Sequence, residues 1–252
     1  MIQRHTCENG LRIVTEKIPS VRSVALGIWV GTGSKYEQEK NNGISHFLEH
    51  MFFKGTSTRS AKEIAETFDE IGGNVNAFTS KEYTCYYARV LDQHAPIALD
   101  VLSDMYFHSV FDAEELEKEK NVVIEEISMY EDTPDDLVHD LIARAAYSKH
   151  PLGYSILGTE DVLRSLKRDD LLNYINAHYL PSNTVVTVAG NFDDNLIEEI
   201  KKRFSGFSRQ GKLAPLSEPE FAANVIAHNK ATEQAHLCLS LPGFKVGHPE
   251  VY

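Results

Sequence analysis

The sequence has few cysteines and no long apolar run. Its three cysteines, Cys7, Cys85 and Cys238, lie far apart and form no Cys-x-x-Cys pair. So sparse and odd a number disfavours a disulfide framework and favours reduced thiols in a cytoplasmic protein. No stretch of about 18 apolar residues is present, which disfavours a transmembrane helix. The N-terminus, MIQRHTCENG, also lacks the apolar core of roughly 7 to 15 residues that a secretory signal carries.

Basic residues are scarce as well. The 252 residues include 25 Lys and Arg against 37 Asp and Glu, which gives a net charge of −12 with His neutral. Nucleic-acid binding needs a basic face, so this balance disfavours nucleic acid as a partner and favours metal ions or cationic ligands. The 42% of hydrophobic residues is ordinary for a folded soluble chain and excludes collagenous and disordered classes.

The pattern of apolar residues predicts an α+β fold, with a mixed, largely antiparallel sheet and helices packed over one face. Alternating or continuous apolar segments bounded by turn residues predict strands, and amphipathic segments with capping signals predict helices. The expected strands are 11–16, 24–30, 74–78, 83–91 and 183–189, and the expected helices are 43–53, 61–71, 95–108, 113–130, 134–147, a short one after 159, 169–178 and 194–204.

The last quarter of the sequence differs from the part before it. Residues 1–208 account for the sheet and its helices, and 209–220 carry Gly, Ser, Pro and Lys without apolar periodicity, which is typical of a linker. Two further strands are expected at 223–228 and 236–241. Because no helix follows to cover them, we interpret 221–252 as the beginning of a second, homologous domain that is truncated.

The motif His46-Phe47-Leu48-Glu49-His50 carries the clearest chemistry. On a helix, His46 and His50 lie one turn apart on one face, with Glu49 beside them. The surrounding residues are apolar, so three ionisable groups would be buried at a cost of several kcal/mol unless something compensates them. Two imidazoles in this spacing suit a tetrahedral zinc ion, which leaves Glu49 placed to take a proton from a bound water. The alternative is a pair of core histidines hydrogen-bonded to the backbone.

A third metal ligand is expected on the helix 113–130. With 3.6 residues per turn, Glu119 and Glu126 fall inside its apolar arc, whereas Glu125 points about 100° away. Beside a histidine pair, Glu126 is the better candidate for a ligand, and Glu119 for a group that orients a ligand. Both could instead be carboxylates at the edge of the apolar face that reach solvent.

The inverted His-x-x-Glu-His motif is a signature of the inverzincins. HFLEHMFFKGT, followed 76 residues after His50 by Glu126 in VVIEEISMYEDTP, closely resembles the pitrilysin (M16) metallopeptidases, and most of all the bacterial relatives of the mitochondrial processing peptidase beta subunit. The resemblance implies the processing-peptidase or LuxS-like metallohydrolase fold, one Zn²⁺ ion on His46, His50 and Glu126, Glu49 as general base acting on zinc-bound water, and Glu119 as a supporting catalytic acid.

The same resemblance extends to the segment GGNVNAFT, which is similar to the edge strand with which extended substrates pair in that family. It implies substrate contacts from Asn74, Asn76, Ala77 and Phe78. An exposed strand edge can bind a peptide through main-chain hydrogen bonds with little demand on its sequence. From composition alone, a plain hairpin with turn-forming Asn residues is the favoured explanation of the segment.

The predicted function is therefore that of a zinc-dependent metalloendopeptidase acting on extended peptides or unfolded segments. The family resemblance implies a missing C-terminal homologous half or partner subunit that closes the peptide chamber, and a homodimer is expected. Nucleic acid and membrane are not expected as partners, because of the acidic balance and the lack of a long apolar run. One alternative is a non-catalytic peptide-binding subunit of a processing-peptidase-like complex. Another is an unrelated zinc hydrolase with the same helix motif, which the Glu126 spacing and the Asn-Ala strand disfavour.

Overall fold

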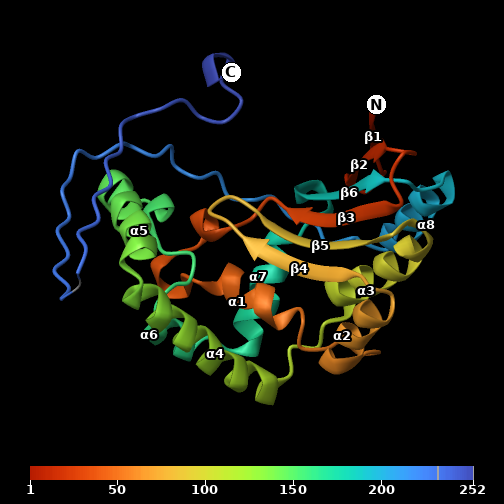
Figure 1. Ribbon diagram of the computed structural model, residues 1–252, viewed down its shortest axis with the longest axis horizontal. Coiled ribbons are helices and arrows are strands. Elements are labelled where there is room, and N and C mark those ends of the chain that lie inside the picture. Colours follow the sequence, from red (N-terminus) through yellow and green to blue (C-terminus); the bar gives the residue numbers. More distant parts are fainter. Residues whose placement is uncertain (232, 252) are drawn as a thin grey trace.

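The computed structural model describes residues 1–231 and 233–251, and these form one six-stranded sheet with helices on one of its faces (Figure 1). The spatial order is β1-β2-β6-β3-β5-β4. Within the described residues β2 and β6 run parallel and the other four neighbouring pairs are antiparallel. The strands are β1 (Ile2–Thr6), β2 (Arg12–Lys17), β3 (Ser23–Val30), β4 (Asn74–Thr79), β5 (Thr84–Leu91) and β6 (Thr184–Gly190). The predicted mixed, largely antiparallel sheet is confirmed.

Strand β3 lies inside the sheet because it is the most apolar of the strands. Val24, Leu26, Ile28 and Val30 alternate along it and are all buried, since side chains two residues apart share one face of a strand. Strand β4 has the opposite character, with exposed residues at alternate positions. It pairs only with β5 among the described strands and so forms an open edge of the sheet.

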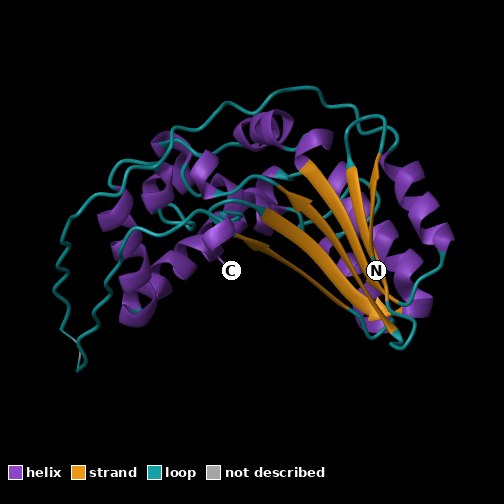
Figure 2. Ribbon diagram, turned by 90° about the horizontal axis from the view of Figure 1, so that it is seen from above, coloured by secondary structure: helices purple, strands orange, loops and turns teal. Residues whose placement is uncertain are grey.

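Most of the helices lie below the sheet in the view of Figure 1, with α5 to its left and α8 at its right end, and Figure 2 shows the same arrangement from above. α3 packs beneath β3 and β5, while α1 contacts β4, β5 and α4. Most of the core lies between this layer and the sheet, with α1 and α3 burying most of their residues. The helices are α1 (Ile44–Met51), α2 (Ala61–Glu70), α3 (Ala95–His108), α4 (Ala113–Asp132), α5 (Pro134–Tyr147), α6 (Glu160–Ser165), α7 (Arg168–His178) and α8 (Asp194–Phe204).

Side-chain caps are observed at the N-terminal ends of α2 and α4. The side chain of Ser60 accepts from the backbone N–H of Glu63, whose own carboxylate accepts from the backbone of Ser60, which is the reciprocal box that the sequence predicts for α2. Asp112 caps α4 through the N–H groups of Glu114 and Glu115. These local interactions fix where the helices begin, and thus the register of the groups that they carry.

The described residues between 208 and 248 lie outside the sheet and the helices and follow an extended path past α5 (Figure 1). The strands predicted at 223–228 and 236–241 are wrong, because the described residues of this stretch form no strand. A strand is stable only when a neighbour satisfies its main-chain groups. Here the contacts are isolated, such as the 2.7 Å hydrogen bond from the N–H of Ala222 to the carbonyl of Ala146. Leu237 and Leu239 are accordingly 93% and 86% exposed.

None of the helices in the described part of the chain is both long enough and apolar enough to cross a bilayer.

Candidate metal centre

Helix α1 carries the histidine motif, and six of its eight residues are buried. Ile44, Phe47, Leu48 and Met51 are each at most 1% exposed, which anchors the helix between the sheet and the neighbouring helices. His46 is 8% exposed. The imidazoles therefore lie on a short helix whose position is set by packing on its other sides.

The structure brings His46, His50 and Glu126 together, although Glu126 comes from α4. Nε2 of His46 lies 3.3 Å from Nε2 of His50. The two oxygens of the Glu126 carboxylate lie 3.7 Å from Nε2 of His46 and 3.5 Å from Nε2 of His50. One ligand atom from each of the three residues lies within 4.8 Å of the other two. Two nitrogens and a carboxylate thus converge on one point.

These distances fit a zinc ion. Bonds of about 2.0–2.2 Å to nitrogen and oxygen at tetrahedral angles place the ligand atoms about 3.3–3.5 Å apart. Two imidazoles and one carboxylate are also the donor set of a catalytic zinc site, in which the fourth position is left for water or substrate. The residues present therefore fit zinc in both chemistry and spacing.

Glu119 lies seven residues before Glu126 on α4. Its carboxylate contacts the other ring nitrogen of His50. Its Oε1 lies 2.8 Å from Nδ1 of His50, and its Oε2 lies 2.5 Å from Nζ of Lys54. This residue is only 4% exposed. By accepting from Nδ1, it directs Nε2 of His50 towards the site, as carboxylates do for metal-binding histidines. Nδ1 of His46 is buried and has no such partner among the described residues.

The two histidines differ in proton affinity for electrostatic reasons. Burial and the neighbouring charge of His50 lower the pKa of His46 to about 4, against the attraction of Glu126. Burial also acts to lower the pKa of His50, but the hydrogen bonds and charges of Glu119 and Glu126 outweigh it and raise that pKa to about 9. A proton and a metal ion therefore compete for His50, and metal binding releases the proton.

Glu49 lies on the same helix as His46 and His50, but its carboxylate is hydrogen-bonded to β4. Its Oε2 accepts a 2.6 Å hydrogen bond from Oγ1 of Thr79, at the end of β4. Burial raises the pKa of Glu49, and the charge of Glu126 acts in the same direction, while Thr79 and His50 oppose them. A carboxylate whose pKa is raised towards neutrality is better suited to accept and return a proton than an ordinary one.

Glu125 lies on α4, and the four predicted substrate-contact residues lie on β4. Glu125 is exposed, whereas Glu126 is half-buried and faces α1. On β4, Asn74 and Asn76 are exposed, Ala77 is 8% exposed and Phe78 is 38% exposed. All four lie on the open edge strand of the sheet, which contacts α1.

Three residues of the site environment were not singled out from the sequence. Thr79 could have been found, because it alternates with Ala77 and so shares the strand face that meets the helices. Lys54 lies four residues after His50, but α1 ends at Met51, so no helical spacing indicates its contact with Glu119. Glu37 lies between two short 3₁₀ turns and accepts hydrogen bonds from the N–H groups of Gly43 and Ser45 at the start of α1, a contact for which the sequence carries no signal.

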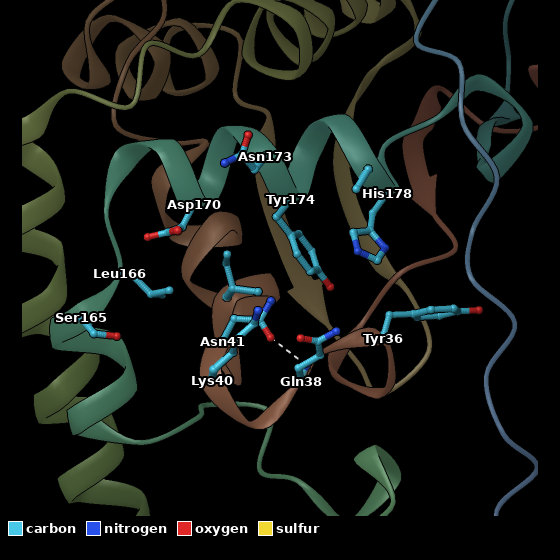
Figure 3. Close-up of a pocket in the computed structure, with 12 residues that line it drawn as sticks. Tyr36, Gln38, Lys40, Asn41, Ser165, Leu166, Asp170, Asn173, Tyr174 and His178 are labelled. Carbon is cyan, nitrogen blue, oxygen red and sulfur yellow. Dashed lines mark hydrogen bonds between the residues drawn. The ribbon is translucent and has the colours of Figure 1, made fainter.

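A separate cavity of about 440 Å³ lies between the loop that precedes α1 and helix α7 (Figure 3). None of the three candidate ligands lines it. Tyr174 and His178 stack in its wall, with ring centroids 4.1 Å apart. Its polar lining comes from side chains such as Gln38, Asn41 and Asn173. It is not part of the metal centre, although Ile44 of α1 borders it.

Comparison with known families gives two matches along the chain. Residues 12–160 match the family described as insulinase, or peptidase family M16, and residues 165–252 match the peptidase M16 inactive domain. His46, Glu49, His50, Glu119 and Glu126 all fall inside the first match.

Several curated proteins are similar over nearly all of the chain. It is 60% identical over 252 residues to an uncharacterized zinc protease, YmxG, of Bacillus subtilis, covering 100% of this chain and 62% of that protein. It is 43% identical to an uncharacterized zinc protease of Streptomyces coelicolor, covering 96% of this chain and 55% of that protein. It is 38% identical to an Arabidopsis thaliana protein named probable mitochondrial-processing peptidase subunit beta, covering 90% and 41%. The chain thus spans about two fifths to three fifths of these relatives.

Solved structures show the same fold. A protease from Helicobacter pylori superposes with a TM-score of 0.80 at 24% identity, covering 88% of this chain and 54% of that one. A putative M16-like peptidase from Alicyclobacillus acidocaldarius superposes with a TM-score of 0.74 at 27% identity, covering 87% and 51%.

Proposed function

The chain belongs to peptidase family M16, and from that premise we propose that it is the metal-bearing part of a zinc-dependent metalloendopeptidase. The observation that carries this proposal is the convergence of His46, His50 and Glu126 within 4.8 Å, with Glu49 on the same helix turn. Two core histidines held by the backbone would explain neither the facing Nε2 atoms nor the carboxylate that approaches both of them.

His46, His50 and Glu126 are the proposed zinc ligands, and Glu119 orients His50. Zinc, when bound, supplies Lewis-acid chemistry, which polarises a peptide carbonyl and lowers the pKa of water. Glu126, Glu119 and an ionised Glu49 together carry three negative charges, which match the two positive charges of the ion and the one of Lys54. The site therefore approaches electrical balance in surroundings where an unpaired charge would be costly.

Glu49 is the proposed general base. It is not among the residues that converge on the metal position, and its hydrogen bond from Thr79 fixes one oxygen while the other remains available. In the proposed reaction Glu49 takes a proton from the attacking water and passes it to the nitrogen of the leaving amine. Water attacks the scissile carbonyl carbon, the C–N bond breaks, and a carboxylic acid and an amine result, which then exchange a proton to give a carboxylate and an ammonium group.

The open edge of β4 is the proposed binding site for an extended peptide. A peptide adding there would pair with the free main-chain groups of β4 and pass beside α1. Oδ1 of Asn76 accepts a 2.8 Å hydrogen bond from the N–H of Ala77. This side chain satisfies the main-chain donor of Ala77 in the absence of peptide, and a carbonyl oxygen of the peptide would take its place. Phe78 and Asn74 lie on the same strand and would contact side chains or main chain of the peptide.

A second half is the proposed partner of this unit. The chain covers 62% of the length of the Bacillus subtilis relative, and its extended C-terminal segment exposes Val225, Leu237 and Leu239 almost completely. Apolar side chains in such a segment need a partner surface. We therefore interpret 1–208 as the metal-bearing domain, 209–220 as a linker and 221–252 as the beginning of a homologous domain, which a further segment or a second copy of the chain would complete.

The test is a measurement of zinc content together with cleavage of a quenched, extended peptide. We expect one zinc ion per chain, loss of turnover after chelation and recovery when zinc is restored. The assay should be made on the 252-residue chain and on a form extended to the length of its relatives. Absence of stoichiometric zinc, or turnover that survives complete metal removal, would refute the proposal. Zinc and peptide binding without turnover in the extended form would favour the non-catalytic subunit instead.

A further inference from the structure

Helix α1 begins without a capping side chain of its own. Gly43 occupies the N-cap position with φ of 95°, a conformation that favours glycine. A Cβ atom there would lie 2.6 Å from the carbonyl oxygen of Leu157, so the close approach of that loop also requires glycine. The first N–H groups of a helix have no partner within the helix and need an external acceptor. For α1 that acceptor must come from elsewhere in the chain.

Glu37 supplies it. Its Oε2 accepts from the N–H of Gly43 at 2.7 Å, and its Oε1 accepts from the N–H of Ser45 at 2.9 Å. Nδ2 of Asn42 donates a further 2.8 Å hydrogen bond to Oε2. Glu37 is only 2% exposed, and the charge of Lys81 acts on it without a direct ion pair between the two described side chains. A buried carboxylate is therefore held by the N-terminal turn of α1 and by the favourable end of the helix dipole.

A further hydrogen bond connects the first turn of α1 to α7. Oγ of Ser45 lies 2.9 Å from the hydroxyl oxygen of Tyr174, and both side chains are buried. Tyr174 is visible in Figure 3, with Tyr36 and Gln38, the sequence neighbours of Glu37, across the cavity from α7. Glu37 thus occupies the junction of α1, α7 and the loop that leads into α1.

That loop is also bonded to the hairpin between β4 and β5. The N–H of Ser34 donates to the carbonyl of Ser80 at 3.2 Å, and the N–H of Lys35 donates to the carbonyl of Lys81 at 2.8 Å. The hairpin turn follows directly after Thr79, whose hydroxyl holds Glu49. The loop carrying Glu37 therefore contacts both elements whose relative position determines the metal site and the peptide edge.

We propose that Glu37 is a positioning residue of the metal centre: by holding the first turn of α1 against the loop 33–37, it places the Nε2 atoms of His46 and His50 and the carboxylate of Glu49 relative to the β4 edge. This inference rests on the proposed function. His46 is adjacent to Ser45 and follows it on the same turn, so a small displacement of that turn moves the ligand directly. An eight-residue helix has little intrinsic stability with which to resist such a displacement.

The test compares Glu37→Gln and Glu37→Asp with the control Asp92→Asn in the 252-residue chain. Gln keeps the volume of Glu but can accept through one oxygen only. Asp keeps the charge, but its side chain is shorter by one methylene. Asp92 is likewise a carboxylate with several donors, namely Arg22 and Asn191. It lies at the end of β5 remote from the hairpin turn. Zinc affinity by competition with a chelating dye, melting temperature of the zinc-free chain, and kcat and KM for peptide are measured for each.

We expect both Glu37 variants to weaken zinc binding about 10-fold or more, the range for residues that support a ligand, and to lower kcat without raising KM. Asp92→Asn should leave zinc affinity within about 2-fold at a comparable loss of melting temperature. Glu37→Asp supplies the result if Glu37→Gln does not fold. Zinc affinity unchanged in the Glu37 variants, or weakened equally in Asp92→Asn, would overturn the positioning role alone. A wild-type chain that binds no zinc would overturn the proposed function and this inference with it.

Discussion

Oγ1 of Thr79 donates a 2.6 Å hydrogen bond to Oε2 of Glu49, which joins the last residue of the edge strand to the helix that carries both histidines. Thr79 is paired with Thr84 in the β4–β5 hairpin, so its hydroxyl is held by the sheet. The orientation of the proposed base is therefore set by the strand along which a peptide would add. A displacement of β4 would therefore also displace the acceptor position of this hydrogen bond at Glu49.

Replacing Thr79 by Val should impair the base without disturbing the metal. Val has nearly the same shape but cannot donate, and a hydrogen bond to a charged group contributes about 1.5–3 kcal/mol. We expect kcat to fall about 10-fold or more, with zinc affinity unchanged. Thr187→Val is a matched control, because its hydroxyl contacts Trp29 on the sheet away from α1. Steady-state kinetics on both variants makes the comparison, and equal kcat values for Thr79→Val and Thr187→Val would contradict the role of this contact.

Replacing Glu49 by Gln should abolish most turnover while leaving zinc bound. Gln keeps the size and can still accept from Thr79, but it cannot take a proton from water. General base catalysis contributes at least about 100-fold, so kcat should fall by that factor or more. Metal analysis of the purified variant provides the second measurement. Retained turnover, or complete loss of zinc, would mean that Glu49 has been assigned the wrong role.

The assignment of Glu126 can be tested against its neighbour. Glu126→Gln removes one of the three converging ligands and should weaken zinc binding by more than the roughly 10-to-100-fold typical of supporting residues. Glu125→Gln changes the same charge on the exposed side of α4 and should have little effect. Competition titrations with a chelating dye measure both affinities. Greater sensitivity at position 125 would show that the helix register is wrong.

Glu119→Gln should have an effect between those two. The amide of this variant can still contact His50, but it lacks the charge that stabilises the ring and pairs with Lys54. Loss of such support costs about 10-to-100-fold in metal affinity. Glu114→Gln, on the exposed first turn of the same helix, is the control for a change of net charge. An affinity for zinc that does not differ between these two variants would argue that Glu119 only stabilises the fold.

The part of the site that could be predicted from sequence is the part with regular spacing. His46, Glu49 and His50 share a helix turn, and Glu119 and Glu126 share an apolar helix face, so periodicity alone groups them. The contact between α1 and α4 is not periodic, because it depends on how the sheet and the helices pack. The presence of a histidine pair made Glu126 the better candidate for a third ligand. The family resemblance then predicted that the residues of α1 and those of α4 form one zinc site.

Contacts made by loops could not be predicted in this way. Glu37 reaches Gly43 and Ser45 because it lies between two short 3₁₀ turns, Ser34–Tyr36 before it and Glu39–Asn41 after it, that fold the chain back on itself. The strands expected at 223–228 and 236–241 do not form. Here the local sequence pattern is present, but the tertiary contact that it needs is missing. Their apolar pattern is suitable for strands, but strand formation also requires a neighbouring strand, which the described residues do not provide.

The last prediction concerns where the metal-bearing unit ends. The family matches divide the chain between 160 and 165, but β6 (184–190) lies inside the sheet, paired with both β2 and β3. Removing everything after 164 would expose two strands and should abolish cooperative folding. Removing 209–252 deletes scattered contacts, such as the 2.5 Å pair of Lys230 and Asp132. It leaves Phe207, the last buried apolar side chain among the described residues, in place.

A chain of residues 1–208 should therefore melt cooperatively within about 4 °C of the 252-residue chain, because surface changes cost only a few tenths of a kcal/mol to about 1 kcal/mol. Its zinc affinity should be the same, since all the proposed ligands remain. It should also associate less, because the exposed side chains of Leu237, Leu239 and Leu241 are gone. Calorimetry, dye competition and light scattering on the two lengths and on residues 1–164 make the test. Cooperative melting of residues 1–164, or loss of zinc binding in residues 1–208, would place the boundary of the unit elsewhere.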